Sequence, residues 1–167
     1  MTKNVSCNVN SRNVVLTMLE KTENGEKSHI VLKNTLDGYQ NIDKQTRAFI
    51  TRLFQGTLER QIELDYIINS YSKTPVEKMK PVIRNILRLS VYQLKYMKSV
   101  PVSAVCNEAV KLAAKRKFSG LKGFVNGVLR NIARNIEDIK YPVNEGKNLS
   151  VKYSMPEWII NLWTQEY

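Results

Sequence analysis

The sequence predicts an all-helical domain of about seven helices with no sheet. Apolar residues recur at helical spacing through most of the chain, and no segment of useful length alternates with period two. The chain has only seven Gly and five Pro among 167 residues, fewer turn formers than many short strands would need. A chain of this length can bury roughly 70% of its unfolded surface, so one hydrophobic core is sufficient to stabilise it.

Turn-forming pairs separate the apolar stripes and mark the expected helix ends: Asn24-Gly25, Thr74-Pro75, Val100-Pro101 and Ser119-Gly120. Ser11 and Asp43 are expected to cap the first and third helices, and Pro81 suits the first turn of the fifth. Thr74 with Glu77 fits a capping box. The helix after Pro81 has the broadest apolar surface, so we expect it to be the central one.

The pattern divides the chain into three parts. Residues 1–10 lack periodicity and are expected to form a flexible lead. Residues 11–139 hold the helical domain. Within residues 140–167, a polar linker over residues 140–150 precedes one helix that begins at Met155, which we interpret as the first helix of a truncated following domain.

The residues that usually carry chemistry are sparse. Cys7 and Cys106 are too few for a disulfide framework, and they fit a reducing cytoplasm. No metal-binding spacing occurs, His29 is interpreted as a lone surface histidine, and Cys106 falls on an apolar helix face where packing explains it. We expect no catalytic residue and no metal site. No apolar run reaches the ~18 residues of a membrane span, and the first residues contain no signal-peptide core.

Charge is concentrated in one part of the chain. Lys and Arg number 26 against 15 Asp and Glu, a net charge of +11. Residues 78–134 hold thirteen basic residues and one acid, Glu108, whereas residues 1–77 hold ten basic and nine acidic residues. Such a window predicts a surface that binds a polyanion.

The basic residues repeat at one-turn spacing on three consecutive helices. Like charges at this spacing disfavour an isolated helix, and a phosphate backbone would convert that repulsion into attraction. The residues expected to contact RNA on this basis are Arg84, Arg88, Lys95, Lys111, Lys115, Arg116, Lys122, Arg130 and Arg134. RNA is favoured over duplex DNA because no DNA-binding motif is evident. Tyr92 and Tyr96 lie near the basic face, although ordinary half-buried tyrosines explain them better.

Two polar pairs interrupt apolar helices. We expect Asn107, Glu108 and Asn126 to form a structural network, in which Glu108 pairs with Asn126 or with a nearby arginine, because a partly buried Glu must be paired. Gly127 is interpreted as a close contact between helices.

Three segments resemble the NusB family: Val105–Ala113 and Gly123–Arg130 match its paired signature, and Val82–Leu94 matches its central helix. The resemblance covers roughly residues 11–136. It implies a NusB-like helical bundle of two packed subdomains that binds RNA. It also implies that Arg12 is the N-terminal contributor to RNA binding, in a region where the family tends to carry more basic residues.

The run Asn148–Trp158 resembles the segment that follows the NusB-like domain in the RsmB (Sun, Fmu) 16S rRNA cytosine-C5 methyltransferases. That resemblance implies a catalytic domain in cis with an S-adenosylmethionine loop and a catalytic cysteine after a proline. Neither feature occurs here, since Cys7 follows Ser6 and Cys106 follows Val105. The expected function is therefore a non-catalytic fragment that positions 16S rRNA, in which Trp158 and Trp163 await a missing partner domain.

Two alternatives remain open. The chain resembles, more broadly, a free-standing NusB-type antitermination factor that binds a leader RNA with a ribosomal protein. A helical adaptor for an acidic protein would also explain the basic window.

Overall fold

The computed structural model describes residues 9–142 and 145–166, and this part of the chain is helical with no strand. The α-helices are α1 (Ser11–Glu23), α2 (Ser28–Asp37), α3 (Lys44–Glu59), α4 (Gln61–Tyr71), α5 (Pro81–Tyr96), α6 (Val102–Lys115), α7 (Lys122–Arg134), α8 (Glu145–Tyr153) and α9 (Glu157–Glu166). Short 3₁₀ turns are η1 (Val76–Lys78), η2 (Ser119–Leu121) and η3 (Ile136–Asp138). The predicted all-helical class and the seven helices within residues 11–139 are confirmed. Residues 1–8 of the predicted lead, with Cys7, and the side chain of Trp163 lie outside the described residues.

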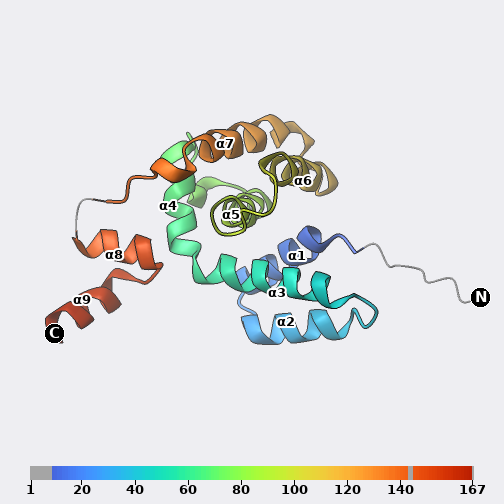
Figure 1. Cartoon of the computed structure of the whole chain (residues 1–167), viewed down its shortest axis with the longest axis horizontal. Coiled ribbons are helices and arrows are strands. Elements are labelled where there is room, and N and C mark those ends of the chain that lie inside the picture. Colours follow the sequence, from blue (N-terminus) through green and yellow to red (C-terminus); the bar gives the residue numbers. More distant parts are fainter. Residues whose placement is uncertain (1–8, 143–144, 167) are drawn as a thin grey trace, which may run out of the picture.

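Helix α5 occupies the centre of the molecule. It packs against α1, α3, α4, α6 and α7, and Figure 1 shows it end-on among them. Every residue from Asn85 to Leu94 is buried, so no face of this stretch reaches solvent. The helices form two groups around it, with α1, α2 and α3 on one side and α4, α6 and α7 on the other. The predicted central position of this helix is confirmed.

The predicted N-terminal signals of the helices are partly confirmed. Asp43 caps α3 by accepting the backbone N–H of Thr46 at 3.0 Å, and Pro81 is the first residue of α5. The cap of α1 is Asn10 rather than Ser11, since the Asn10 side chain accepts the backbone N–H of residue 13 at 3.1 Å. An N-cap must have non-helical backbone angles, and Ser11 is already helical.

The capping box at Thr74 and Glu77 is wrong. The chain forms the η1 turn there, and the Thr74 backbone N–H donates to Ser72 Oγ at 3.2 Å. The turn uses local side chains of the loop itself, so no helix begins at Thr74 for Glu77 to cap.

The C-terminal segment also differs from the prediction. The C-terminal half of the predicted linker is helical, so two helices, α8 and α9, follow residue 144 in place of one. The hairpin that they form packs beside α4 (Figure 1). Ser154, in the turn between α8 and α9, accepts the backbone N–H of Ile62 at 3.0 Å through Oγ. Because Arg60 provides no side-chain cap for α4, this serine satisfies an N–H group that the helix itself cannot.

Close contact between helices occurs at a glycine that the sequence did not indicate. Gly56 in α3 is buried against the ring of Tyr92 in α5, and an added Cβ would overlap the ring. Gly127 in α7 is exposed, with nothing near the position of an added Cβ. The predicted helix contact at Gly127 is therefore wrong, because this residue lies on the outer face of α7.

These two glycines give opposite predictions for the same substitution. We expect Gly56→Ala to lower the free energy of unfolding by about 1–3 kcal/mol, because the buried Tyr92 ring must move. Gly127→Ala should raise it by up to about 1 kcal/mol through helix propensity alone. Urea unfolding of both variants measures the difference, and equal effects would contradict the assigned contact.

Candidate nucleic-acid interface

The fold divides the nine predicted RNA contacts of the basic window into two sets of side chains. One set is directed inward or along helix interfaces, where acids from the first half of the chain neutralise it. The other set lies on the outer faces of α6 and α7. This division decides which of the predicted residues can meet a ligand.

Arg88 belongs to the inward set. It is buried at 7% exposure, and its Nε and Nη2 donate to the two carboxylate oxygens of Asp65 at 2.7 and 2.9 Å. Its Nη1 donates to Asn85 Oδ1 at 3.2 Å. The predicted contact of Arg88 with RNA is therefore corrected: the residue is an internal ion pair between α5 and α4, out of reach of a phosphate backbone.

Three more predicted RNA contacts are half-buried and paired with acids: Arg84 with Glu23, Lys95 with Glu63, and Arg116 with Glu20. The Lys95–Glu63 and Arg116–Glu20 pairs are separated by 3.5 and 3.1 Å. Since each of these cations has a carboxylate partner inside the protein, its charge is neutralised by that partner and stabilises the packing of the helices. Sequence analysis missed the four acidic partners; the only signal was the nine acids of residues 1–77 facing an excess of cations.

Arg12 is held in a similar way by neutral groups. Its Nε donates to Gln93 Oε1 at 2.9 Å, and its guanidinium lies over the Phe49 ring, 5.2 Å from the centroid. Burial lowers the pKa of Arg12, while the negative charge of Glu108 acts in the opposite direction. Arg12 lines a cleft of about 670 Å³ with Phe49 and Glu108, so one part of it still faces solvent.

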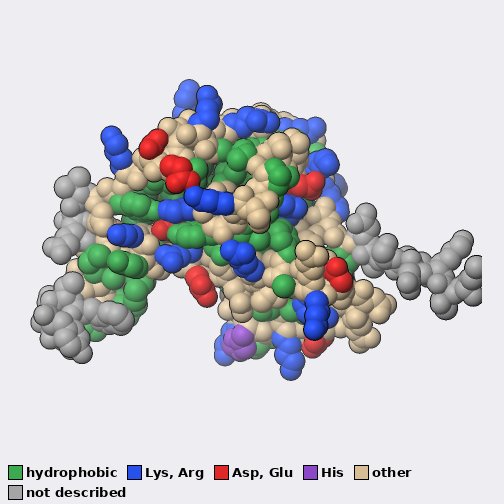
Figure 2. Space-filling view, in the orientation of Figure 1, with side chains coloured by type: hydrophobic (Ala, Val, Ile, Leu, Met, Phe, Trp, Pro, Cys, Tyr) green, Lys and Arg blue, Asp and Glu red, His purple; other side chains and the backbone are tan. Residues whose placement is uncertain are grey.

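The remaining predicted residues share one outer surface. We call Lys111, Lys115, Lys122, Arg130 and Arg134 the α6–α7 face. All five are exposed, and Figure 2 shows Lys and Arg side chains gathered along the edge formed by α7 and α6. Of these five cations, only Lys111 has a carboxylate partner within residues 9–142 and 145–166, namely Glu108 at 3.5 Å.

The packing of the two helices explains this face. The buried residues of α6 and α7 are apolar and recur at helical spacing, so the two helices pack through one side each and turn their cations outward. A groove of about 490 Å³ runs between them, with Lys111, Lys122 and Arg130 around it. Asn107 and Asn126 also line this groove. The result is a groove lined by three cations and two asparagines from two packed helices.

The predicted polar network is not formed. Glu108 pairs with Lys111 in the same helix, and Asn126 Oδ1 accepts from Arg130 Nε at 3.1 Å. No hydrogen bond joins Asn107, Glu108 and Asn126 to one another in the described part of the chain. The two asparagines are instead parts of the groove wall, and Asn126 fixes the direction of the Arg130 guanidinium.

The described residues offer little for catalysis. Cys106 is buried, and burial raises the pKa of its thiol, so packing explains it as the sequence predicted. No three His, Cys, Asp or Glu side chains of residues 9–142 and 145–166 are placed to hold a metal ion. None of the helices described is both long enough and apolar enough to span a bilayer.

Comparison with known proteins gives matches of two kinds. The model of the NusB family matches residues 9–134. A probable ribosomal RNA small subunit methyltransferase B from Bacillus subtilis (strain 168) is 36% identical over 161 residues, covering 93% of this chain and 35% of the relative. The chain thus spans about a third of the length of that relative.

The second kind of match is to antitermination proteins. A transcription antitermination protein NusB from Dictyoglomus thermophilum is 35% identical over 130 residues, which cover 77% of this chain and 85% of the relative. The crystal structure of antitermination factors NusB and NusE in complex with dsRNA superposes with a TM-score of 0.68 at 26% identity. That match covers 74% of this chain and 93% of the other.

The division of the cations predicts different effects on stability. Arg88→Ala should lower the free energy of unfolding by about 3 kcal/mol, because it leaves a carboxylate without its partner in a mostly buried site. Arg130→Ala should change it by less than about 0.5 kcal/mol, since Arg130 is on the surface. Urea unfolding tests this, and a similar small loss in both variants would show that Arg88 is not an internal ion pair.

Proposed function

Because this chain belongs to the NusB family, we propose that it is an RNA-binding domain of an S-adenosylmethionine-dependent 16S rRNA cytosine-C5 methyltransferase. Its role is to hold small-subunit rRNA by the phosphate backbone while another part of the enzyme performs the chemistry. The observation that carries the proposal is the α6–α7 face, whose five cations are all exposed and include three, Lys111, Lys122 and Arg130, that line one groove. Because the proposed ligand is ribosomal RNA, we also propose a cytoplasmic location.

The α6–α7 face suits a polyanion for a physical reason. Its cations come from two packed helices, so their spacing is fixed before a ligand arrives. In the described chain, Lys115, Lys122, Arg130 and Arg134 have no carboxylate partner, and their mutual repulsion is relieved when phosphates bind. A known NusB structure of the same fold is a complex with dsRNA, which supports the same ligand class.

The methyltransferase part of the proposal rests on the extent of the matches. The match to the methyltransferase relative covers all but 7% of this chain. The uncovered residues are fewer than those of α8 and α9 together, so the matched region includes part of the α8–α9 hairpin. The match to the antitermination protein leaves 23% outside. The longer relative thus matches part of the segment that forms the hairpin here, and this supports the methyltransferase assignment.

S-adenosylmethionine does not fit the described residues. No strand is present there to carry a glycine-rich cofactor loop, and the one described cysteine is buried in the helical core. We therefore assign cofactor binding and the catalytic cysteine to the rest of such a methyltransferase, and no step of methyl transfer to this chain.

The second candidate is a free-standing antitermination factor. It is favoured by the match that covers 85% of an antitermination protein. An adaptor for an acidic protein is the third candidate, and it differs from both in how binding should depend on salt.

A potassium chloride titration with a small-subunit rRNA hairpin tests the face itself. We expect Lys111→Gln/Arg130→Gln to weaken binding and to reduce the magnitude of the log–log salt slope by about 1.4 to 1.8, because each lost phosphate contact removes about 0.7 to 0.9. Lys27→Gln/Lys33→Gln removes two exposed charges near and on α2, and this control should leave the slope unchanged. Equal losses in the two variants would show that only net charge matters. Substitutions of Arg84 or Arg88 are not used in this test, because removing either positive charge would break an ion pair inside the protein and destabilise the fold.

Competition between two RNAs separates the candidates. We expect the chain to prefer the small-subunit rRNA hairpin over an antitermination leader RNA of equal length, since the proposed parent acts on rRNA. Preference for the leader RNA would favour the antitermination factor. Binding to neither RNA at low salt would favour the adaptor.

A further inference from the structure

A second basic surface lies on a different face, at the C-terminal end of α5. We call it the α5-end patch and define it by Arg52, Arg60, Tyr96, Lys152 and Tyr153. The patch shares no residue with the α6–α7 face. Figure 2 shows Lys and Arg side chains over the region where Figure 1 shows α5 end-on.

Contacts join these residues into one surface. Arg52 Nη2 donates to the Tyr96 carbonyl at 2.8 Å, and the Arg60 guanidinium lies 5.3 Å from the centroid of the Tyr96 ring. Arg60 Nη1 donates to the Lys152 carbonyl at 3.1 Å, so the patch extends from the bundle onto the α8–α9 hairpin. Lys95 Nζ also lies 5.7 Å from the Tyr96 centroid, but it is paired with Glu63 and is not counted in the patch.

The charge of the patch is largely uncompensated. The hydrogen-bond partners of Arg52 and Arg60 are neutral carbonyl groups, in contrast to the carboxylate partners of Arg84, Arg88 and Arg116. Within the residues that the structure describes, no carboxylate pairs with Arg52, Arg60 or Lys152. A guanidinium has five N–H donors. Since each of these two arginines uses one donor internally, the rest can engage phosphate oxygens.

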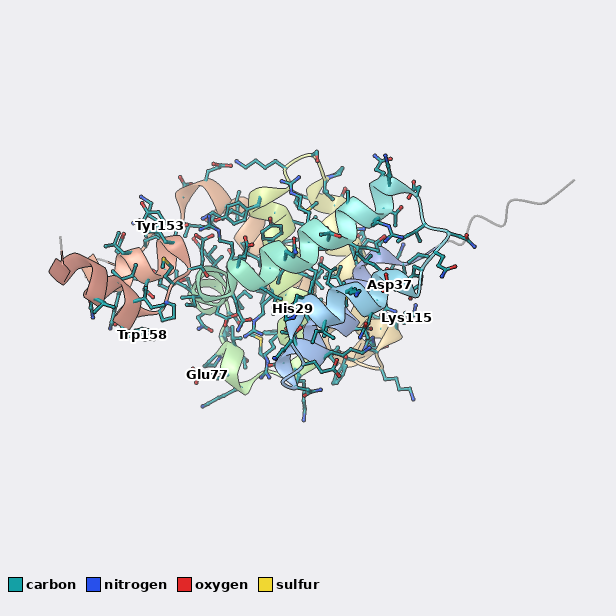
Figure 3. The ribbon with its side chains drawn as sticks, turned by 90° about the horizontal axis from the view of Figure 1, so that it is seen from below. His29, Asp37, Glu77, Lys115, Tyr153 and Trp158 are labelled. Atoms are coloured by element: carbon teal, nitrogen blue, oxygen red, sulfur yellow. The ribbon has the colours of Figure 1, made fainter. Side chains whose placement is uncertain are left out.

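The patch also contains an aromatic ring accessible to a base. Tyr153 is 53% exposed, and Lys152 Nζ lies 5.8 Å from the centroid of its ring. Figure 3 places Tyr153 on the side of the molecule away from Glu77, which precedes the N-terminus of α5, so it lies on the side where α5 ends. Trp158, a second exposed aromatic among the described side chains of the hairpin, lies on the opposite side in the same view and is not part of the patch.

From this arrangement we infer that the α5-end patch binds a single-stranded segment of RNA. Arg52, Arg60 and Lys152 contact its phosphates, and Tyr153 stacks on one unpaired base. An acidic protein would pair with the cations of the patch. Single-stranded RNA would contact the cations through its phosphates and also stack a base on the exposed Tyr153 ring. The inference takes its ligand class from the proposed function but concerns a separate surface, so the two can fail independently.

The charge test uses Arg52→Gln/Lys152→Gln, in which Arg60 is retained because it holds the hairpin. With a single-stranded 16S rRNA fragment as the probe, the magnitude of the log–log salt slope should fall by about 1.4, or about 0.7 for each phosphate contact. Lys27→Gln/Lys33→Gln is the control of equal charge. Circular dichroism and the thermal midpoint check that each variant is folded.

The stacking test uses Tyr153→Ala with Trp158→Ala as its matched control. Tyr153→Ala should weaken single-stranded binding about tenfold, because one stacked base is lost. It should leave binding of the same sequence, annealed to its complement, unchanged. Trp158→Ala should leave both unchanged.

The outcomes separate the two surfaces. If the patch variants bind as their controls do while Lys111→Gln/Arg130→Gln loses affinity, the inference is wrong and the proposed function stands. If variants of neither surface lose affinity, both are wrong. If poly-glutamate binds the patch as tightly as RNA does and loses that binding in the same variants, the patch is a site for an acidic protein.

Discussion

The burial of α5 on every side is the constraint on which the rest of the structure depends. A helix with no solvent face can satisfy its polar side chains only inside the protein. Of the buried polar residues of α5, Asn85, Arg88 and Gln93 have partners, whereas the Ser90 hydroxyl has none among the described residues. Asn85 donates to a Glu23 carboxylate oxygen at 2.8 Å, Arg88 pairs with Asp65, and Gln93 accepts from Arg12. Helices α1 and α4 are therefore fixed against α5 by charge as well as by apolar packing.

This constraint also determines where the positive charge of the protein is exposed. Acids of α1 and α4 form ion pairs with the cations of α5 and with Arg116 at the end of α6. These cations therefore contribute to stability rather than to ligand binding. The cations of α6 and α7 have few acids near them and stay on the surface. A sequence window with one acid among thirteen basic residues thus yields two physically different populations, one internal and one exposed.

The α8–α9 hairpin is attached to the bundle by polar contacts. Ser154 satisfies an N–H group at the start of α4, and Arg60 donates to the Lys152 carbonyl. Ser154 has a φ of +54°, a backbone angle that non-glycine residues seldom adopt. The Ser154 hydroxyl holds the turn in this conformation by accepting the N–H group of α4. The conformation of the hairpin turn therefore depends on its contact with the bundle. Leu162 of the hairpin is 50% exposed, so no other described residue covers this apolar part of the hairpin surface.

The sequence by itself determined the helical class, the positions of the seven bundle helices and the central place of α5. These follow from apolar periodicity and turn residues, which are local properties of the chain. It also located the exposed cations of α6 and α7, because amphipathic spacing predicts an outward face.

Only the tertiary structure decided which cations were internal. Arg88 and Arg130 have the same one-turn spacing to another arginine, but Arg88 meets Asp65, 23 positions away in sequence. Similarly, the glycine in close helix contact is Gly56 rather than Gly127, because the neighbour that decides this, Tyr92, comes from another helix. The α5-end patch joins residues from α3, α5 and α8, which no local pattern brings together. Pairing over such distances depends on how the helices pack, and helical periodicity carries no information about that.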